Sequence, residues 1–197
     1  MRTLKVTASI LILLCTLFIC AWLAETIRVD HWGFAIAVNF LFMACFTLIF
    51  GVLHTPAYSS AYFEARPFER DGAIYRWFGA SLFRSLLRSS GWHRLTWGSP
   101  PLDGTLTSLR DFEYRTKGSE LVHLLAMICV AGVTVYVGWR HSIRDTLWLV
   151  PSNILFNVYP VLLQRHNRPR VNGLIRRKQA FLDAPADRER KVADRGP

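Results

Sequence analysis

The chain lacks the short motifs that place many metal-dependent and serine-dependent enzymes in a class. Its six histidines are 18 to 39 residues apart, so neither His-x-x-x-His nor His-Glu-x-x-His occurs. Its four cysteines include no Cys-x-x-Cys pair, and no Gly-x-Ser-x-Gly turn is present. We therefore expect no metal centre, no disulfide framework, no resident cofactor and no nucleophile of the hydrolase type.

Charge is missing from four long stretches, although the 197 residues carry a formal net charge of +10. Each stretch has about the length that a membrane span needs, roughly 17–25 residues. The second contains one strongly polar side chain, Asn39, and the fourth is broken by Pro151 and Pro160. We predict an all-α polytopic membrane protein with four transmembrane helices, at residues 6–24, 32–53, 121–139 and 146–163.

The first stretch could instead be a cleaved signal peptide, since Arg2 and Lys5 precede it. Its apolar run is longer than the 7–15 residues usual for such peptides, and no clean small-x-small cleavage site follows it. These features favour a retained membrane anchor.

Basic residues decide the orientation of membrane spans. The two short loops between predicted spans hold three of the 24 Lys and Arg residues, and the N-terminus, central segment and tail hold the other 21. We therefore expect both termini in the cytoplasm and the protein in the cytoplasmic (inner) membrane. Anionic membrane lipid, rather than nucleic acid, is the partner we expect for the basic tail.

Residues 54–118 form a central segment too long to be a turn, and we predict that it is helical and cytoplasmic. The stretch AIYRWFGASLFRSLLRSS (73–90) has apolar residues at every fourth position with arginines to one side. A basic amphipathic helix of this kind suits a membrane interface, and it could equally pack on the spans. TLTSLRDFEYRTKG (105–118) predicts a second short helix that ends at Gly118, with Ser119 capping the third span.

The prediction for domain organisation follows from these segments. Residues 1–170 form one integral membrane domain, and residues 171–197 form a basic tail. Most of the tail after Phe181 is polar and weakly periodic, so we expect it to be disordered.

An acid and a base, Glu120 and His123, stand at the start of the third apolar stretch, three residues apart and on one face of a helix. Their presence has a simple structural explanation. An acid in the first turn of a helix is stabilised by the helix dipole, and ionisable groups at span ends are tolerated. The predicted topology also offers a functional explanation, because it brings polar residues of several spans to the same cytoplasmic face. We expect these residues to line one pocket: His54, Glu120, His123, Asn157 and His166.

Three blocks of sequence resemble the glycosyl-4,4'-diaponeurosporenoate acyltransferase family. They are YFEARPFERDGAIYRWFGASLFRSLL (62–87), ELVH (120–123) and NVYPVLLQRHNRPR (157–170). The family consists of small membrane proteins that esterify the sugar of a glycosylated carotenoid with a fatty acyl chain. The resemblance implies an acyltransferase that uses a donor such as acyl-CoA or acyl carrier protein, a glycosylated lipid acceptor and, as possible partners, other carotenoid-pathway enzymes. It implies no catalytic residues.

The chemistry itself suggests roles for particular residues. A sugar hydroxyl must lose a proton to attack an acyl carbonyl, and an imidazole with an ordinary pKa near 6.5 suits that task. We expect His123 to be the general base, with Glu120 fixing its tautomer in the manner of a triad acid. Arg66, Arg70 or Arg168 could supply an oxyanion donor or bind phosphate, while His54 and His166 share the cytoplasmic face. Asn153 and Asn157 could bind sugar hydroxyls or could stabilise the proline-broken fourth helix.

Two other functions stay open at this stage. One is a small membrane methyltransferase of the isoprenylcysteine type, although QRHNRPR (164–170) only partly resembles the Arg-His-Pro motif of those enzymes. The other is a non-catalytic subunit that binds anionic lipid through its tail and its central helix.

Overall fold

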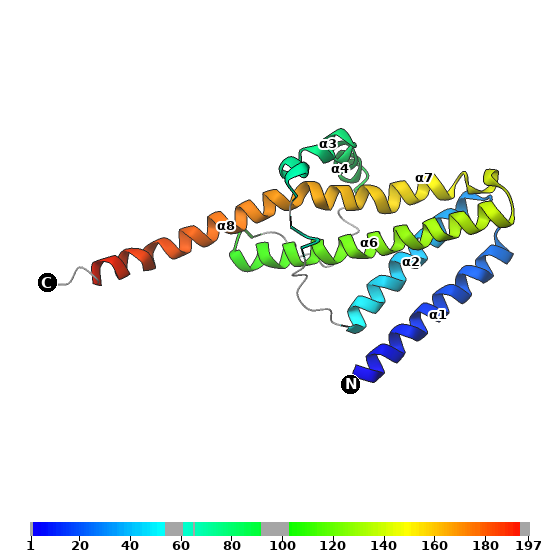
Figure 1. Cartoon of the computed structure of the whole chain (residues 1–197), viewed down its shortest axis with the longest axis horizontal. Helices are drawn as coiled ribbons and strands as arrows, with labels where there is room; N and C mark the ends of the chain where they lie inside the picture. The colour runs from blue at the N-terminus through cyan, green and yellow to red at the C-terminus, as the bar shows by residue number, and fades with distance from the viewer. Residues whose placement is uncertain (1, 54–60, 65, 92–102, 194–197) are drawn as a thin grey trace. The chain divides into compact units, whose positions relative to one another are not determined.

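The computed structural model describes residues 2–53, 61–64, 66–91 and 103–193, with side chains described as far as residue 184. Within these residues the chain is helical and contains no strand (Figure 1). Four helical segments are long and apolar enough to cross a membrane: Arg2–Thr26, Trp32–Leu53, Leu106–Arg140 and Ile143–Ala184. The predicted all-α fold with four candidate spans is confirmed.

The chain divides into two compact units. The first unit comprises Met1–Phe63 and Lys117–Gln164, and the second comprises Glu64–Thr116 and Arg165–Pro197. Two long helices, α6 and α8, each contribute residues to both units.

Helices α1 (Arg2–Thr26) and α2 (Trp32–Leu53) form a helical hairpin in the first unit (Figure 1). Helix α2 supplies half of the buried apolar core, and α6 and α7 supply the rest; the core residues are Phe34, Ala35, Val38, Phe42, Ala126, Val130, Val137 and Leu149. Helix α1 leaves most of its Leu, Ile and Phe side chains exposed. Such a surface suits contact with lipid tails, as expected of an outer helix in a membrane bundle.

Helix α6 (Leu106–Arg140) is continuous, and the predicted break at Gly118 is wrong. A glycine inside a helix costs only about 1 kcal/mol relative to alanine, which the many helix-forming residues on both sides of it offset. The true start of α6 is capped by Thr105, whose hydroxyl accepts a hydrogen bond from the Ser108 backbone N–H at 3.2 Å. Glu120 therefore lies in the middle of a helix, where the helix dipole does not explain its charge.

The fourth span is irregular where prolines were expected to disturb it. A short turn, η2 (Ile143–Thr146), leads into α7 (Leu149–Asn153), a π-helical turn η3 (Ile154–Val158) and then α8 (Tyr159–Ala193). Pro160 has no N–H to donate to the Phe156 carbonyl, and its ring crowds that carbonyl in a regular helix. The wider π turn relieves this crowding and displaces Asn157 from the ordinary helical register.

Helix α8 extends much further than the sequence indicated. It continues to Ala193, whereas the sequence led us to expect disorder after Phe181. This region is rich in Arg, Lys, Gln and Ala, all good helix formers. The Gln179 amide also donates to the Asp183 carboxylate four residues later at 3.1 Å.

The second unit begins with the 3-10 turn η1 (Pro67–Gly72), followed by α3 (Ile74–Trp77) and α4 (Ala80–Ser89). The single helix predicted over residues 73–90 is therefore two helices. Gly79 breaks it with φ of 82°, a left-handed conformation that glycine adopts readily. The predicted apolar stripe is largely uncovered, since Phe78 is 60% exposed, Leu82 76% and Leu86 53%. The alternative in which this stripe packs on other helices is not seen in the described residues.

Candidate active site

Three asparagines form a buried chain of hydrogen bonds in the apolar bundle of the first unit. The Asn157 amide of η3 donates to Asn39 Oδ1 of α2 at 2.6 Å and to Asn153 Oδ1 of α7 at 2.8 Å. Asn153 donates in turn to the Met127 carbonyl of α6 at 3.1 Å. Asn39 also donates to the Ser152 hydroxyl at 3.0 Å. The network thus connects three spans at the point where the fourth helix is distorted.

His123 of α6 lies beside this asparagine network. Its imidazole lies close to the Asn157 side chain and to the Phe156 backbone. Phe156 is the residue whose carbonyl would receive the N–H of residue 160 in a regular helix, and that residue is proline. In a neutral imidazole one ring nitrogen carries the proton and the other keeps a lone pair.

Two buried atoms at this position have no hydrogen-bond partner among the described residues, namely His123 Nδ1 and Asn157 Oδ1. Buried polar atoms nearly always have a hydrogen-bond partner, so two buried acceptors without one in an apolar bundle require an explanation. Both atoms accept hydrogen bonds when the other ring nitrogen of His123 carries the proton. A ligand that offers two O–H groups would satisfy both.

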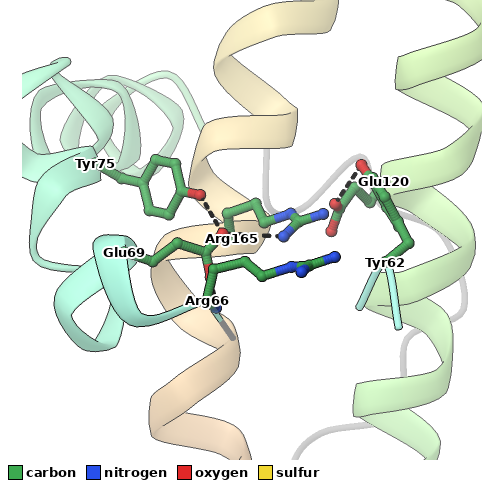
Figure 2. A network of polar contacts seen from close by, with 6 residues as sticks. All are labelled: Tyr62, Arg66, Glu69, Tyr75, Glu120 and Arg165. Carbon is green, nitrogen blue, oxygen red and sulfur yellow. Dashed lines mark hydrogen bonds and ion pairs between the residues drawn. The ribbon is translucent and has the colours of Figure 1, made fainter. Parts of the chain in front are cut away.

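The structure gives Glu120 a tyrosine partner that the sequence did not indicate. Its side chain is fully buried, and its carboxylate accepts a hydrogen bond from the Tyr62 hydroxyl at 2.9 Å (Figure 2). The neighbours of the His123 ring are the Asn157 side chain and the Phe156 backbone.

A second polar cluster surrounds Glu69 of η1 in the second unit. The Glu69 carboxylate accepts hydrogen bonds from the Tyr75 hydroxyl and from Arg165 at 2.9 Å (Figure 2). Its other oxygen accepts from the Arg66 backbone N–H at 2.8 Å. Burial by itself raises the pKa of the Glu69 carboxyl, but these hydrogen bonds and the positive charge of Arg165 outweigh burial and hold the pKa below its ordinary value.

His166 and Arg168 of α8 are also buried in the second unit, with 2% and 4% of their surfaces exposed. His166 Nδ1 lies 2.8 Å from the Gly72 carbonyl oxygen, to which it donates. Arg70, the other arginine proposed from the sequence, is exposed and sits in the same tight turn with φ of 46°.

The predicted site residues thus fall into two groups. The first unit brings His123, Asn153 and Asn157 together. In the same unit the Glu120 carboxylate accepts a hydrogen bond from the Tyr62 hydroxyl. The second unit holds Arg66, Arg70, His166 and Arg168. His54 lies outside the described residues. In the part of the chain that the structure describes, no three His, Cys, Asp or Glu side chains gather closely enough to hold a metal ion.

Five side chains of these clusters were missed as site candidates: Asn39, Tyr62, Glu69, Tyr75 and Arg165. Asn39 was noticeable as the one strongly polar residue of its span, and such residues usually face the interior of a bundle. Glu69 follows Arg66 by three positions, the spacing at which a carboxylate reaches back to the start of a helical turn. No local pattern marks the two tyrosines, whose partners Glu120 and Glu69 can only be found from the fold.

Comparison with known families decides the class of the protein. The family model described as glycosyl-4,4'-diaponeurosporenoate acyltransferase matches residues 59–177, more than half of the chain. The chain belongs to this acyltransferase family. As a member of the glycosyl-4,4'-diaponeurosporenoate acyltransferase family it is an enzyme, which sets aside the methyltransferase and non-catalytic alternatives. No curated protein and no solved structure matches the chain.

Proposed function

We propose that this member of the family transfers a fatty acyl group to a hydroxyl of the sugar on a glycosylated carotenoid or a similar glycolipid. Acyl-CoA or acyl carrier protein would serve as the donor. The observation that carries the proposal is the unpaired, buried Nδ1 of His123 in a chain of this family. A neutral imidazole whose buried nitrogen has an unused lone pair can act as a general base.

The reaction can be written with His123 as the only proton carrier. Nδ1 accepts the proton of the sugar hydroxyl while the oxygen forms a bond to the carbonyl carbon of the acyl thioester. The tetrahedral intermediate then breaks its C–S bond and releases a thiolate, which takes the proton back from the imidazolium. The products are a sugar ester, a free thiol and the original neutral histidine.

The asparagine network suits a carbohydrate acceptor. A sugar presents neighbouring hydroxyl groups, so one can donate to His123 Nδ1 and the next to Asn157 Oδ1. Asn153 and Asn39 hold Asn157 in place through two hydrogen bonds, at 2.8 and 2.6 Å. Asn157 is therefore the residue we expect to choose which hydroxyl is presented to the base, and Asn153 to support it.

For the donor, we propose that arginines of the second unit bind its phosphate groups. Arg66, Arg70 and Arg168 are the candidates, and guanidinium groups match phosphate geometry well. His54 and His166 are proposed to contact substrate as well. Enzymes that make or glycosylate the carotenoid are possible partners, because they would deliver a membrane-dissolved acceptor.

We further propose that the enzyme works at the cytoplasmic face of the inner membrane, with both termini in the cytoplasm. The surface formed by Trp77, Phe78, Leu82 and Leu86, here called the interfacial face, supports a membrane position for the second unit. Trp77 is 88% exposed, and the other three residues are more than half exposed. Residues 73–90 contain Arg76, Arg84 and Arg88 but no acid, which complements anionic lipid headgroups.

The proposal is tested with the full chain reconstituted in lipid nanodiscs. Glycosyl-4,4'-diaponeurosporenoate would be supplied with a labelled acyl-CoA, and in a parallel reaction with acyl carrier protein carrying the same chain. Mass spectrometry should show an ester on the sugar in at least one reaction. Absence of ester with both donors, while other glycolipid acceptors are also left unchanged, would overturn the proposed function.

A further inference from the structure

A second histidine, His166, also has a buried ring nitrogen that lacks a partner among the described residues, as His123 does. Its Nδ1–H donates to the Gly72 carbonyl oxygen at 2.8 Å, and its Nε2 is buried with no partner among the described residues. The whole side chain is 2% exposed, so bulk water does not satisfy this nitrogen. A buried acceptor left in this state is a strong indication that a ligand supplies the donor.

The turn that seats His166 is built at a conformational cost. Arg70, Asp71 and Gly72 all have left-handed backbone conformations, with φ of 46°, 53° and 82°. Residues other than glycine rarely adopt this region, and such strain persists only where the surrounding structure enforces it, often at functional sites. Here the three successive left-handed residues direct the Gly72 carbonyl at the imidazole.

Position 72 also accepts only glycine. A Cβ atom added there would lie 2.8 Å from the His166 backbone oxygen and 3.2 Å from its Cα. The turn and α8 therefore approach each other as closely as two backbones can, and the approach fixes the direction of the His166 ring. The nearby Glu69 carboxylate, paired with Arg165 at 2.9 Å, ties the same turn to α8 and supports this geometry.

We propose that His166 Nε2 is a substrate-binding acceptor, which receives a hydrogen bond from an O–H or N–H group of a substrate in the acyl-transfer reaction. The inference rests on the proposed function and assigns this nitrogen a ligand chemistry. Two groups in the reaction can donate: a hydroxyl of the sugar acceptor, and an amide N–H of the pantetheine arm shared by coenzyme A and acyl carrier protein.

The decisive variant is His166→Asn. An asparagine side chain places its amide N–H near the position of Nδ1, so it can still donate to the Gly72 carbonyl, but it offers nothing in place of Nε2. We expect the variant to fold as the parent does, and we expect KM to rise roughly tenfold, the effect of about one lost hydrogen bond. A rise for the acceptor identifies a sugar hydroxyl, and a rise for the donor identifies a pantetheine amide.

Substrate analogues provide a second measurement that does not depend on the variant folding. Acceptors lacking one sugar hydroxyl at a time, and donors with an N-methylated pantetheine amide, would be assayed with the parent enzyme. One analogue should lose roughly tenfold in kcat/KM. The same analogue should cause no further loss of kcat/KM in His166→Asn, because the substitution and the analogue each remove the same hydrogen bond to Nε2.

His141→Asn is the matched control. It makes the same change at an exposed histidine outside the proposed site, so both KM values should stay at the parent level. The proposal is overturned if His166→Asn is folded and neither KM changes, or if no analogue distinguishes the parent from the variant. In either case ester formation by the parent enzyme would still stand, so the proposed function is judged separately.

Discussion

The amide of Asn157 donates to the side-chain oxygen of Asn39 at 2.6 Å, although 118 positions of sequence separate the two residues. This bond connects the distorted fourth span to the second span inside an otherwise apolar core. In the bilayer interior such a group has no water as an alternative partner. The bond therefore matters both for the packing of the first unit and for the position of the residue that lies beside His123.

Asn39→Ala should destabilise the protein by about 1 kcal/mol or more, because it leaves a buried amide of Asn157 with one acceptor fewer. Thr47→Ala on the same helix is the control, since Thr47 is exposed and its hydroxyl bonds only to its own helix at Met43. Unfolding of both variants in mixed detergent micelles measures the difference. Equal stability of the two variants would contradict the structural role of the network.

Glu69 should make the protein sensitive to acid. The folded-state pKa of its carboxyl lies below the ordinary value of 4.5. Its stabilising contribution is therefore complete above about pH 4.5 and is lost as the pH falls through the lower, folded-state pKa. Thermal unfolding followed from pH 7 to pH 3 should show a smaller dependence on pH for Glu69→Gln than for the parent. Glu64→Gln, which alters an exposed acid of the same unit, should keep the parent's dependence.

The interfacial face should contact lipid. In a background with the four native cysteines replaced by alanine, spin labels would be attached at Trp77→Cys, Leu82→Cys and Ser85→Cys in nanodiscs. The first two should be reached by oxygen dissolved in the bilayer, and the label at the exposed position 85 should be reached by a water-soluble nickel complex. Oxygen and nickel accessibilities that are equal at all three positions would contradict membrane contact.

The topology is tested by labelling from outside the cell with a membrane-impermeant thiol reagent. Ser142→Cys lies in the short loop after α6, and Thr107→Cys lies near the start of that helix; both positions are exposed. The distribution of basic residues predicts that position 142 is labelled and position 107 is not. The opposite pattern would place both termini outside.

The fold was accessible from the sequence because each span is a long uncharged run, which depends on composition alone. The kink in the fourth span was accessible for a similar reason, since Pro151 and Pro160 stand in that run. Helix boundaries that depend on weak local preferences could not be predicted from the sequence. Gly118 is a usual helix end, yet the helix continues through it, and the residues after Phe181 look too polar to fold but continue α8.

The candidate site was predictable in its residue types and less so in its partners. His123 and Asn157 were chosen from the sequence and do meet. The pairing of Glu120 with Tyr62 depends on how a segment 58 positions away returns to α6, which no spacing encodes. The strained turn at residues 70–72 contains an Asp-Gly pair, a common turn signal, but no spacing in the sequence indicates that its carbonyl contacts His166.

The central claim, that His123 is the general base, is tested most directly by the initial rate of ester formation for His123→Ala in nanodiscs. The account predicts a fall of roughly 10²–10⁴-fold at an unchanged level of folded protein. His141→Ala, which alters an exposed histidine just after the same helix, should keep the parent's rate. A folded His123→Ala that forms the ester as fast as His141→Ala would contradict the account.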